Sequence, residues 1–526
     1  MWLSAVFYLF GALFALSLIS DFLMFLKLQK FYSNPRVQVL FGPKLLLVLK
    51  MMQDFKTDPF KSHRQIMSKT KNKDWIVMPA AQKSGARFFI PRSEKAFKEY
   101  FKLEIKNFDR FNVIGEKGLL EGIFATNTEG MHRRAFFSKL FNFENMKKMH
   151  PGMKTIVQEH IKTLKAKVQK RPDGVVDIRK DFMIDLIDDI STFLVLGQRT
   201  GNSITVLGDT FMNKVKEVFQ ASLLDLSMSP VNLFTFGLAR KLGFDPVMNR
   251  VRAIKAALSE VATHEYKRVF NEFDSEAVNR DESTKNSVIN LLVRHNKEVG
   301  EKGNGTSGGE EFTDKPLSMD RVVDMILAFI LAGSDTTFNA TSSTLSLLAE
   351  HPEIQDRIRK EILEDPQIQN SEYTFENLDS KPVLGAAMKE SMRLVPPAPM
   401  GFWRVATKPT KICGITIQKG DLIQLSYIAQ GVDPSVFKER MQFDPERFLQ
   451  EGKSAHYPKI GKTDYLPFSL GQRACQGKNL AELILKTVVA EVLKTFKLVE
   501  NVGDLNTFKS EPGYGFGDNR IQLQVI

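Results

Sequence analysis

The sequence predicts a mainly helical α+β fold with small β-sheets, preceded by one membrane-spanning helix. Apolar residues recur at helical spacing through most of the stretch from Met146 to Asp365. Strand-like alternation is confined to three stretches, at 75–90, 411–427 and 514–526. An uncharged apolar run opens the chain. These three observations indicate a helical body, a few short strands and an N-terminal anchor.

The N-terminal run is long enough to cross a membrane. Its first 20 residues carry no charge, and the apolar character resumes at 22–26, whereas a span needs about 20 residues. Lys27, Lys30 and Arg36 follow, so the positive-inside rule places the rest of the chain in the cytosol. A cleaved signal peptide is the alternative, but no charged start or small-residue cleavage site is evident. We expect residues 1–27 to be the anchor, 28–60 a linker and membrane-proximal segment, and 61–526 the functional domain.

Composition is that of a large domain in a reducing compartment. The 526 residues are 43% hydrophobic and include only two cysteines, Cys413 and Cys475, too few for a disulfide scaffold. The net charge of +12 is scattered, so it either attracts an acidic partner or only keeps the protein soluble. No nucleic-acid motif is present. The polar, Gly-rich stretch 296–315 is interpreted as a solvated loop.

The longest predicted helix runs from Ser318, a suitable N-cap, to Glu350, before a natural His-Pro stop. At roughly 33 residues it would be about 50 Å long. Gly333 within it costs about 1 kcal/mol relative to alanine, and the neighbouring Asp335 and Thr336 are costly to bury unless they face something polar. Such local conflicts often mark functional sites, although a kink lined by threonine hydroxyls is the structural alternative.

A loop before the last long apolar helical run centres on Cys475. Its sulfur would lie at a helix N-terminus, where free N–H groups and the dipole favour a thiolate. Gly471 and Gly477 allow a tight turn and close approach to a flat cofactor. Arg473 offers a cation for a buried carboxylate, and Phe468 would shield the sulfur from water. The alternative is an ordinary buried cysteine, but five fixed positions at set spacing argue against it.

A third signature combines Glu390 and Arg393, three residues apart on one face of a predicted helix over 383–394. Alone, this is an ordinary surface pair worth about 0.3 kcal/mol. It precedes a Phe-Asp-Pro-Glu-Arg-Phe segment that contains Arg447, which itself lies about 30 residues before the cysteine loop.

The pattern FxxGxRxCxG around Cys475 resembles the haem-binding loop of the cytochrome P-450 superfamily, in its eukaryotic microsomal form. Residues 332–337 are similar to the family's distal-helix pattern (A/G)GxDTT, residues 390–393 to its ExxR motif, and Arg447 to the arginine of its PERF-like segment. Their order and spacing agree with the family over most of the chain after residue 90. The resemblance implies the P-450 fold, a helical bundle around haem b, with Cys475 as the axial thiolate.

In that family the distal helix passes over the open face of the haem. The resemblance therefore implies a groove for dioxygen at Ala332 and Gly333, and proton delivery by Asp335 and Thr336. It also implies that Glu390, Arg393 and Arg447 form a buried cluster that locks the core beneath the haem, with a structural role.

The resemblance also implies contacts to the haem propionates. Arg473 is one candidate, and Arg404 matches the position of a propionate-binding arginine in eukaryotic members. Family members commonly place a tryptophan four residues before a further arginine, but the corresponding stretch 129–137 has no tryptophan. Arg133 and Arg134 therefore both remain candidates. The segment 414–420 is expected to be a hairpin between two turn glycines.

The implied activity is that of a monooxygenase that inserts one atom of dioxygen into a lipophilic substrate such as a fatty acid, sterol or xenobiotic. The chain has no room for a fused flavin domain, so electrons would come from a separate NADPH-dependent flavoprotein reductase, with a cytochrome b5-type protein as an optional donor. The implied location is the endoplasmic reticulum membrane, single-pass, with the domain facing the cytosol. Two alternatives stay open: a haem-thiolate isomerase or lyase acting on peroxides, and a haem-binding sensor without turnover.

Overall fold

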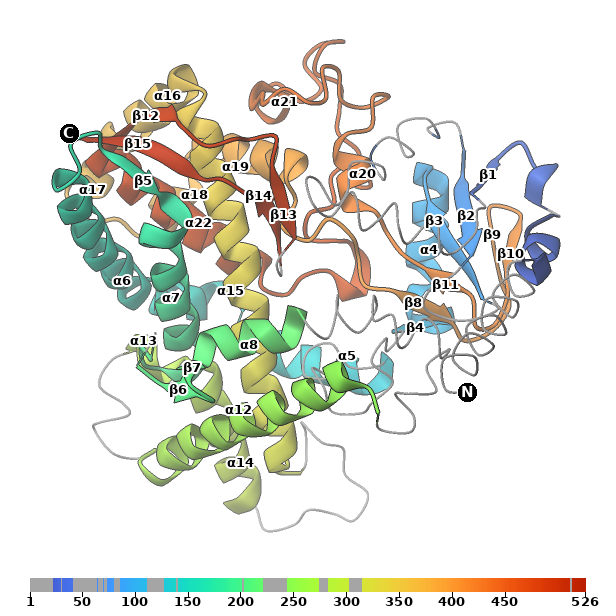
Figure 1. Ribbon diagram of the computed structural model, residues 1–526, viewed down its shortest axis with the longest axis horizontal. Helices are drawn as coiled ribbons and strands as arrows, with labels where there is room; N and C mark the ends of the chain where they lie inside the picture. The colour runs from blue at the N-terminus through green and yellow to red at the C-terminus, as the bar shows by residue number, and fades with distance from the viewer. Residues whose placement is uncertain are drawn as a thin grey trace, which may run out of the picture.

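The computed structural model describes residues 22–29, 31–40, 64, 70, 73–79, 86–110, 127–138, 141–200, 203–220, 244–273, 282–301, 315–510 and 513–526. Within these residues a large helical body lies beside a smaller sheet-rich part, and the helix α15 (Met319–Ala349) crosses the middle of the helical body (Figure 1). The mainly helical α+β prediction is confirmed. Most of the predicted membrane span lies outside the described residues.

The helices before α15 are α4 (Glu94–Asn107), α5 (Asn127–Ser138), α6 (Phe143–Gln169), the π-helix η1 (Arg179–Met183), α7 (Ile184–Leu196), α8 (Phe211–Gln220), α12 (Pro246–Asn271), α13 (Glu282–Lys285) and α14 (Val288–Glu301). Those after it are α16 (Pro352–Leu363), α17 (Pro366–Gln369), α18 (Phe375–Asp379), α19 (Pro382–Leu394), α20 (Tyr427–Gly431), α21 (Glu446–Leu449), the 3-10 turn η3 (Gly471–Arg473) and α22 (Lys478–Thr495).

The helix α15 forms the axis of the main hydrophobic core. It starts at the predicted cap, because the Ser318 side chain accepts a hydrogen bond from the Arg321 N–H, and it stops before Glu350 as expected. It packs against α7, α12, α19 and α22. Among the described residues it is also the one helix long and apolar enough to cross a membrane, but most of it is buried inside the protein, so its composition reflects its place in the core.

The strands form small sheets. Within the described residues the largest has six strands in the order β1 (Val37–Val39), β2 (Trp75–Pro79), β3 (Arg87–Pro91), β11 (Leu422–Ile423), β8 (Arg404–Ala406) and β4 (Phe108–Arg110). A second sheet joins β12 (Phe496–Asn501), β15 (Arg520–Val525) and β5 (Val175–Asp177). Three antiparallel pairs complete the set: β6 (Thr205–Val206) with β7 (Asp209–Thr210), β9 (Thr410–Ile412) with β10 (Ile415–Ile417), and β13 (Phe508–Ser510) with β14 (Tyr514–Phe516).

Two local predictions need correction. The stretch 296–315 is not a loop at its start: α14 continues to Glu301, and the Asn296 side chain donates to the Tyr266 hydroxyl at 2.8 Å and to the Leu317 carbonyl at 3.1 Å. These two hydrogen bonds stabilise the polar Asn296 within the helix. The segment 414–420 is only half of a hairpin, because β10 pairs backward with β9 around the turn at Gly414. After Gly420 the chain leaves to join the six-stranded sheet as β11.

The first described segment is helical over 22–29 and packs on the large sheet. Met24, Leu28 and Phe31 are buried in the same hydrophobic cluster as Trp75 and Phe89. This part of the chain therefore belongs to the core of the sheet-rich region.

Candidate functional site

The loop before α22 is a compact turn that presents the sulfur of Cys475. The Cys475 N–H donates to the Phe468 carbonyl at 2.9 Å, which closes the loop, and Ser469 and Gly471 both have positive φ, +60° and +76°. Gly477 is the N-cap of α22, and its N–H donates to the Cys475 sulfur. The predicted placement of the sulfur at a helix N-terminus is thus what the structure shows.

Cys475 is accessible and yet largely surrounded by protein. Its accessible area is that of an exposed residue, yet burial is the main cause that raises the pKa of its thiol. The Gly477 N–H and the Arg134 charge lower this pKa, but by less than burial raises it. The expectation that the helix terminus alone favours a thiolate is therefore too simple: desolvation opposes it, as it does for any buried anion.

The helix α5 holds the cysteine loop from one side. The Arg134 guanidinium donates to the Ala474 carbonyl, and the Gln476 side chain donates to the Arg134 carbonyl at 2.7 Å. Arg133, the other candidate, is fully buried. Arg134 is therefore in direct contact with the cysteine loop.

A cluster of arginines lies beside the loop, around the buried carboxylate of Glu104. Arg110 on β4 and Arg404 on β8 are directly opposite each other in the sheet, and Arg473 donates to the Phe108 carbonyl at 3.3 Å. Like charges on paired strands repel each other. Burial, followed by the charges of Arg404 and Arg473, holds the pKa of Arg110 well below its usual range.

This cluster fits a dianionic group such as the two propionates of haem. Nη1 of Arg473 is buried and donates to no residue that the structure describes. Burial and the charge of Arg404 lower the pKa of Arg473, which marks a site short of negative charge. Arg404 and Arg134 lie close enough to influence each other. An anion placed here would satisfy the open donor and relieve the repulsion.

The helix α15 exposes a short polar patch in the middle of an otherwise buried run. Ala332 and Gly333 are half-buried and Thr336 is exposed, while the residues on either side are buried. The Thr336 hydroxyl donates to the Ala332 carbonyl at 2.8 Å. One turn earlier, the ring of Phe329 lies 5.6 Å from that of Phe141.

Phe141 connects this helix to the cysteine loop, because a Cβ on Gly477 would meet the Phe141 ring at 3.9 Å. Phe141 thus lies between the sulfur-bearing loop and Phe329, one turn before the open patch of α15.

Asp335 points away from this patch, into a buried charge cluster. Burial, above all, raises the pKa of Asp335 to about 6; Asp188 adds to the rise, and Lys216 and Arg179 oppose it. Lys216 forms an ion pair with Asp188 at 2.8 Å. Oδ2 of Asp335 is buried and accepts no hydrogen bond from the described residues, and Asp335 and Thr336 make none with each other. A relay between them would need a bridging water or a side-chain rotation.

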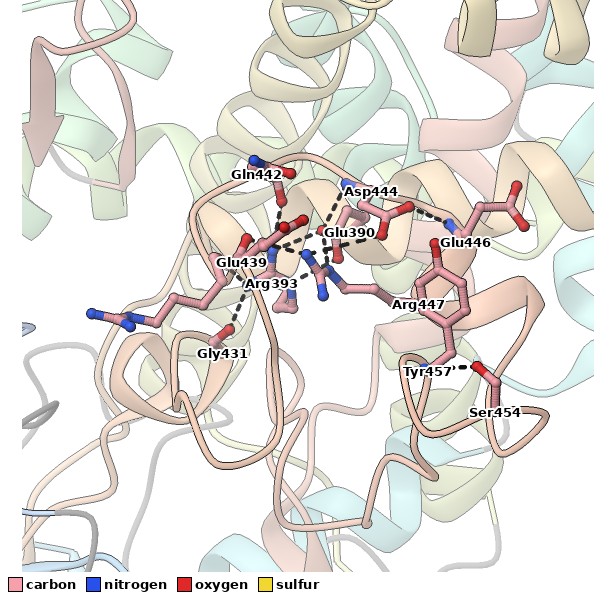
Figure 2. Close-up of polar contacts among 11 residues, drawn as sticks. Glu390, Arg393, Gly431, Glu439, Gln442, Asp444, Glu446, Arg447, Ser454 and Tyr457 are labelled. Carbon is pink, nitrogen blue, oxygen red and sulfur yellow. Dashed lines mark hydrogen bonds and ion pairs between the residues drawn. The ribbon is translucent and has the colours of Figure 1, made fainter.

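The structure brings Glu390, Arg393 and Arg447 together in one buried network (Figure 2). Arg393 donates to both carboxylate oxygens of Glu390 at 2.7 Å, and Arg447 Nε donates to Oε1 at 3.1 Å. The Glu390 and Arg393 side chains are fully buried. The remaining donors of Arg393 reach the carbonyls of Gly431, Arg440 and Gln442. All its N–H groups are used, which only a guanidinium can do.

Sequence reasoning missed two members of these networks, Gly431 and Glu104. Gly431 lies in no predicted motif, yet its carbonyl accepts a hydrogen bond from Arg393. Glu104 lies in no motif, although it is a carboxylate in the last turn of α4, where helix amphipathicity could have flagged it as inward-facing.

Comparison with known proteins agrees with this geometry. A family model for cytochrome P-450 matches residues 82–525. The Caenorhabditis elegans cytochrome P-450 CYP13A7 is 26% identical over 373 residues, 69% of each chain. CYP13A5 of the same organism is 35% identical over 184 residues, 35% of this chain and 34% of that protein, so this match spans about a third of that relative's length.

Among solved structures, the retinoic acid-bound cyanobacterial CYP120A1 superposes with a TM-score of 0.68 at 22% identity, covering 89% of this chain and 94% of that one. This likeness shows the same fold. The family match over most of the chain, together with the cysteine loop and the arginine cluster that fit haem, shows that the protein belongs to the cytochrome P-450 family, with Cys475 as the thiolate that would hold the haem.

Proposed function

We propose that this protein inserts one atom of dioxygen into a lipophilic organic substrate, using electrons from a separate reductase. The observation that carries the proposal is the open patch at Ala332, Gly333 and Thr336 in the otherwise buried α15. A half-buried glycine and alanine leave room for a diatomic molecule, and an exposed hydroxyl beside them can pass a proton. When bound, haem with a thiolate ligand supplies the chemistry that cleaves the O–O bond.

The chain's own residues divide the remaining tasks. Thr336 presents the hydroxyl next to the dioxygen groove, and Asp335, with its pKa near 6, holds a proton that can be exchanged close to neutral pH. Arg134, Arg404 and Arg473 bind the propionates. Arg133, fully buried one position earlier on the same helix, stays a further candidate for a propionate.

We infer an apolar substrate, such as a fatty acid, sterol or xenobiotic, from the side chains that precede the groove. The stretch 326–331 of α15 is entirely apolar. The tip of the β13–β14 pair packs on the same helix, because a Cβ atom on Gly513 or Gly515 would lie 2.5 Å from the Asn339 side chain. CYP120A1 binds retinoic acid, an apolar molecule with one carboxylate. Retinoic acid and a saturated fatty acid are therefore sensible first probes.

The proposed electron donor is an NADPH-dependent flavoprotein reductase, with a cytochrome b5-type protein as a second source. Two exposed lysines, Lys389 on α19 and Lys478 on α22, lie near Glu482. Glu482 belongs to the part of α22 that directly follows the cysteine loop. Cations at this position would attract an acidic donor to the thiolate side of the haem and speed its association.

We further propose a single-pass anchor in the endoplasmic reticulum membrane, with the catalytic domain in the cytosol. Support comes from the helical residues 22–29, which follow the uncharged N-terminal run. Phe22, Leu23 and Leu26 are 61%, 54% and 47% exposed, so the outer side of this segment is apolar where it leaves the domain. Lys27 and Arg36 follow on the side that the positive-inside rule assigns to the cytosol.

The carbon monoxide difference spectrum of the dithionite-reduced protein tests the haem chemistry. We expect a Soret band shifted far to the red for the wild type and for Cys413→Ser, the variant at the other cysteine, and its loss in Cys475→Ser. Turnover is then tested with reductase, NADPH and the probes under dioxygen. Product that carries one labelled oxygen atom supports the monooxygenase. Conversion of a hydroperoxide without NADPH would instead favour an isomerase or lyase. A normal spectrum with no turnover of any probe would favour a haem-binding sensor.

A further inference from the structure

Glu104 is the carboxylate around which the arginine cluster is built. It lies in the last turn of α4 and is buried, with 3% of its surface exposed. Its Oε1 accepts a hydrogen bond from the Tyr100 hydroxyl at 3.1 Å and one from Arg404 Nε at 3.3 Å. Its backbone carbonyl accepts the N–H of Phe108, the residue that starts β4. One residue thus connects α4, β4 and β8.

The position of Glu104 is fixed from several sides. A Cβ on Gly471, in the cysteine loop, would lie 3.6 Å from Glu104 Oε2. That oxygen is buried and accepts no hydrogen bond from the residues that the structure describes. The carboxylate therefore lies against the loop that carries the haem ligand, with one oxygen committed to Arg404 and the other still available.

The charge around it is strongly positive. Arg404 contacts Glu104 directly, Arg473 and Arg134 lie within electrostatic reach of it, and Arg110 faces Arg404 across the strand pair. Two propionates would bring two negative charges to this cluster. Without Glu104, Arg404 would lose the carboxylate that orients its guanidinium.

We propose that Glu104 is a positioning residue at the edge of the haem: its carboxylate orients Arg404 toward the cofactor and offsets part of the arginine charge, which lowers the reduction potential of the haem. Reduction of ferric to ferrous haem adds one electron, and a fixed negative charge nearby opposes that addition. The effect is larger in a buried site than at a surface, because little solvent screens it. The inference rests on haem binding and not on the monooxygenase activity.

The test is a spectroelectrochemical titration of the full-length, detergent-solubilised holoprotein in Glu104→Gln. We expect the midpoint potential to shift to a more positive value, while the reduced carbonyl band of thiolate-ligated haem is retained. Glu104→Asp, which keeps the charge, should stay nearer to the wild type. The matched control is Glu99→Gln on the same helix: it also removes one carboxylate, which accepts the Cys413 N–H at 2.7 Å, away from the arginine cluster. A shift in Glu104→Gln no larger than that of Glu99→Gln would overturn the proposal.

A second variant keeps the test valid if Glu104→Gln does not retain haem. Tyr100→Phe keeps the carboxylate but removes the hydroxyl that donates to it. The charge of Glu104 is then less attenuated, so the midpoint potential should move the other way, to a more negative value. No shift, or a positive one, would contradict the assignment. The titration uses neither substrate nor reductase, so a failed turnover assay leaves its outcome unaffected.

Discussion

Gly431 and Arg393 are in direct backbone contact: a Cβ on Gly431 would lie 2.4 Å from the Arg393 carbonyl oxygen, and the Gly431 carbonyl accepts Arg393 Nη1 at 2.7 Å. The absence of a side chain at Gly431 is therefore a packing requirement of the Glu390 network. It allows α20 to approach α19 closely enough for the guanidinium to use its donors.

Gly431→Ala should destabilise the protein by about 1–3 kcal/mol, because the added methyl group meets backbone that cannot move without disturbing Arg393. Urea unfolding followed by circular dichroism measures the change. The matched control is Gly385→Ala on α19, where an added Cβ meets nothing within 4 Å and helix propensity improves by up to about 1 kcal/mol. Equal stabilities of the two variants would show that the close contact is unimportant.

The two glycines of the cysteine loop should respond differently to alanine. Gly471 has φ +76°, and a Cβ there would lie 3.2 Å from the Phe101 ring, so Gly471→Ala should cost about 1–2 kcal/mol from the left-handed backbone alone. Gly477 has φ −82°, and its Cβ would make ordinary contacts at 3.9 Å and 4.0 Å, so Gly477→Ala should cost less than about 1 kcal/mol. Thermal unfolding of both variants checks this order; the reverse order would contradict it.

Asp335→Asn should stabilise the protein near neutral pH. The pKa of Asp335 is raised from 3.8 to about 6, so between these values the folded state binds more protons than the unfolded state, and stability falls as pH rises through this window. Above it, the loss is about 3 kcal/mol. The asparagine variant escapes this loss, so the difference in unfolding free energy between variant and wild type should grow from pH 4 to pH 7.

Asp365 provides the opposite case for the same substitution. Burial alone would raise its pKa, but the hydrogen bond and charge of Lys381, 2.9 Å away, hold it below the usual value. Asp365→Asn should therefore lower stability at neutral pH and make no difference at a pH below the lowered pKa. A gain in stability at pH 7 in Asp365→Asn would show that the ion pair with Lys381 is not stabilising, and a loss in Asp335→Asn would show that burial of Asp335 is not costly.

Thr336→Ala should keep haem and fold but divert reducing equivalents to hydrogen peroxide, because the hydroxyl beside the groove no longer delivers a proton to the bound oxygen site. The ratio of product to NADPH consumed, with peroxide measured in parallel, reports the coupling. Thr341→Ala is the matched control. The Thr341 hydroxyl donates to the carbonyl four residues earlier, that of Thr337, at 2.8 Å, as the Thr336 hydroxyl does to that of Ala332, but Thr341 is fully buried. Unchanged coupling in Thr336→Ala would remove this residue from the mechanism.

The parts of this structure that a sequence can specify are those in which neighbouring residues carry the signal. The helix α15 follows from its cap at Ser318 and its Pro stop, and α19 from its apolar face, so both were predicted to within a residue or two. The cysteine loop was recognisable because its spacing is local. In contrast, α14 extends into a polar stretch because Asn296 forms hydrogen bonds with Tyr266 and Leu317. These partners are far away in sequence, so the residues around Asn296 do not predict the contact.

The site shows the same division. Cys475 and Glu390 were found through their motifs. The role of Glu104 could not be predicted in this way, because it depends on contact between α4 and β8, which are 300 residues apart. The choice between Arg133 and Arg134 depends on the rotation of α5 about its axis, and Asp335 and Thr336, although adjacent, point into different environments. Side-chain direction on a helix follows from what packs against each face, and that is set by tertiary structure.

The helical residues 22–29 set a limit on how the domain can be shortened. A deletion of residues 1–26 cuts at the end of the predicted anchor, but it would also remove Met24, which is buried beside Leu28 and Phe31 under the large sheet. The shortened protein would keep an unfilled gap in its core and expose the sheet beneath. A cut before Phe22 removes the uncharged run and leaves this packing intact, so the useful starting point for a detergent-free enzyme lies inside the apolar stretch, several residues ahead of its first lysine.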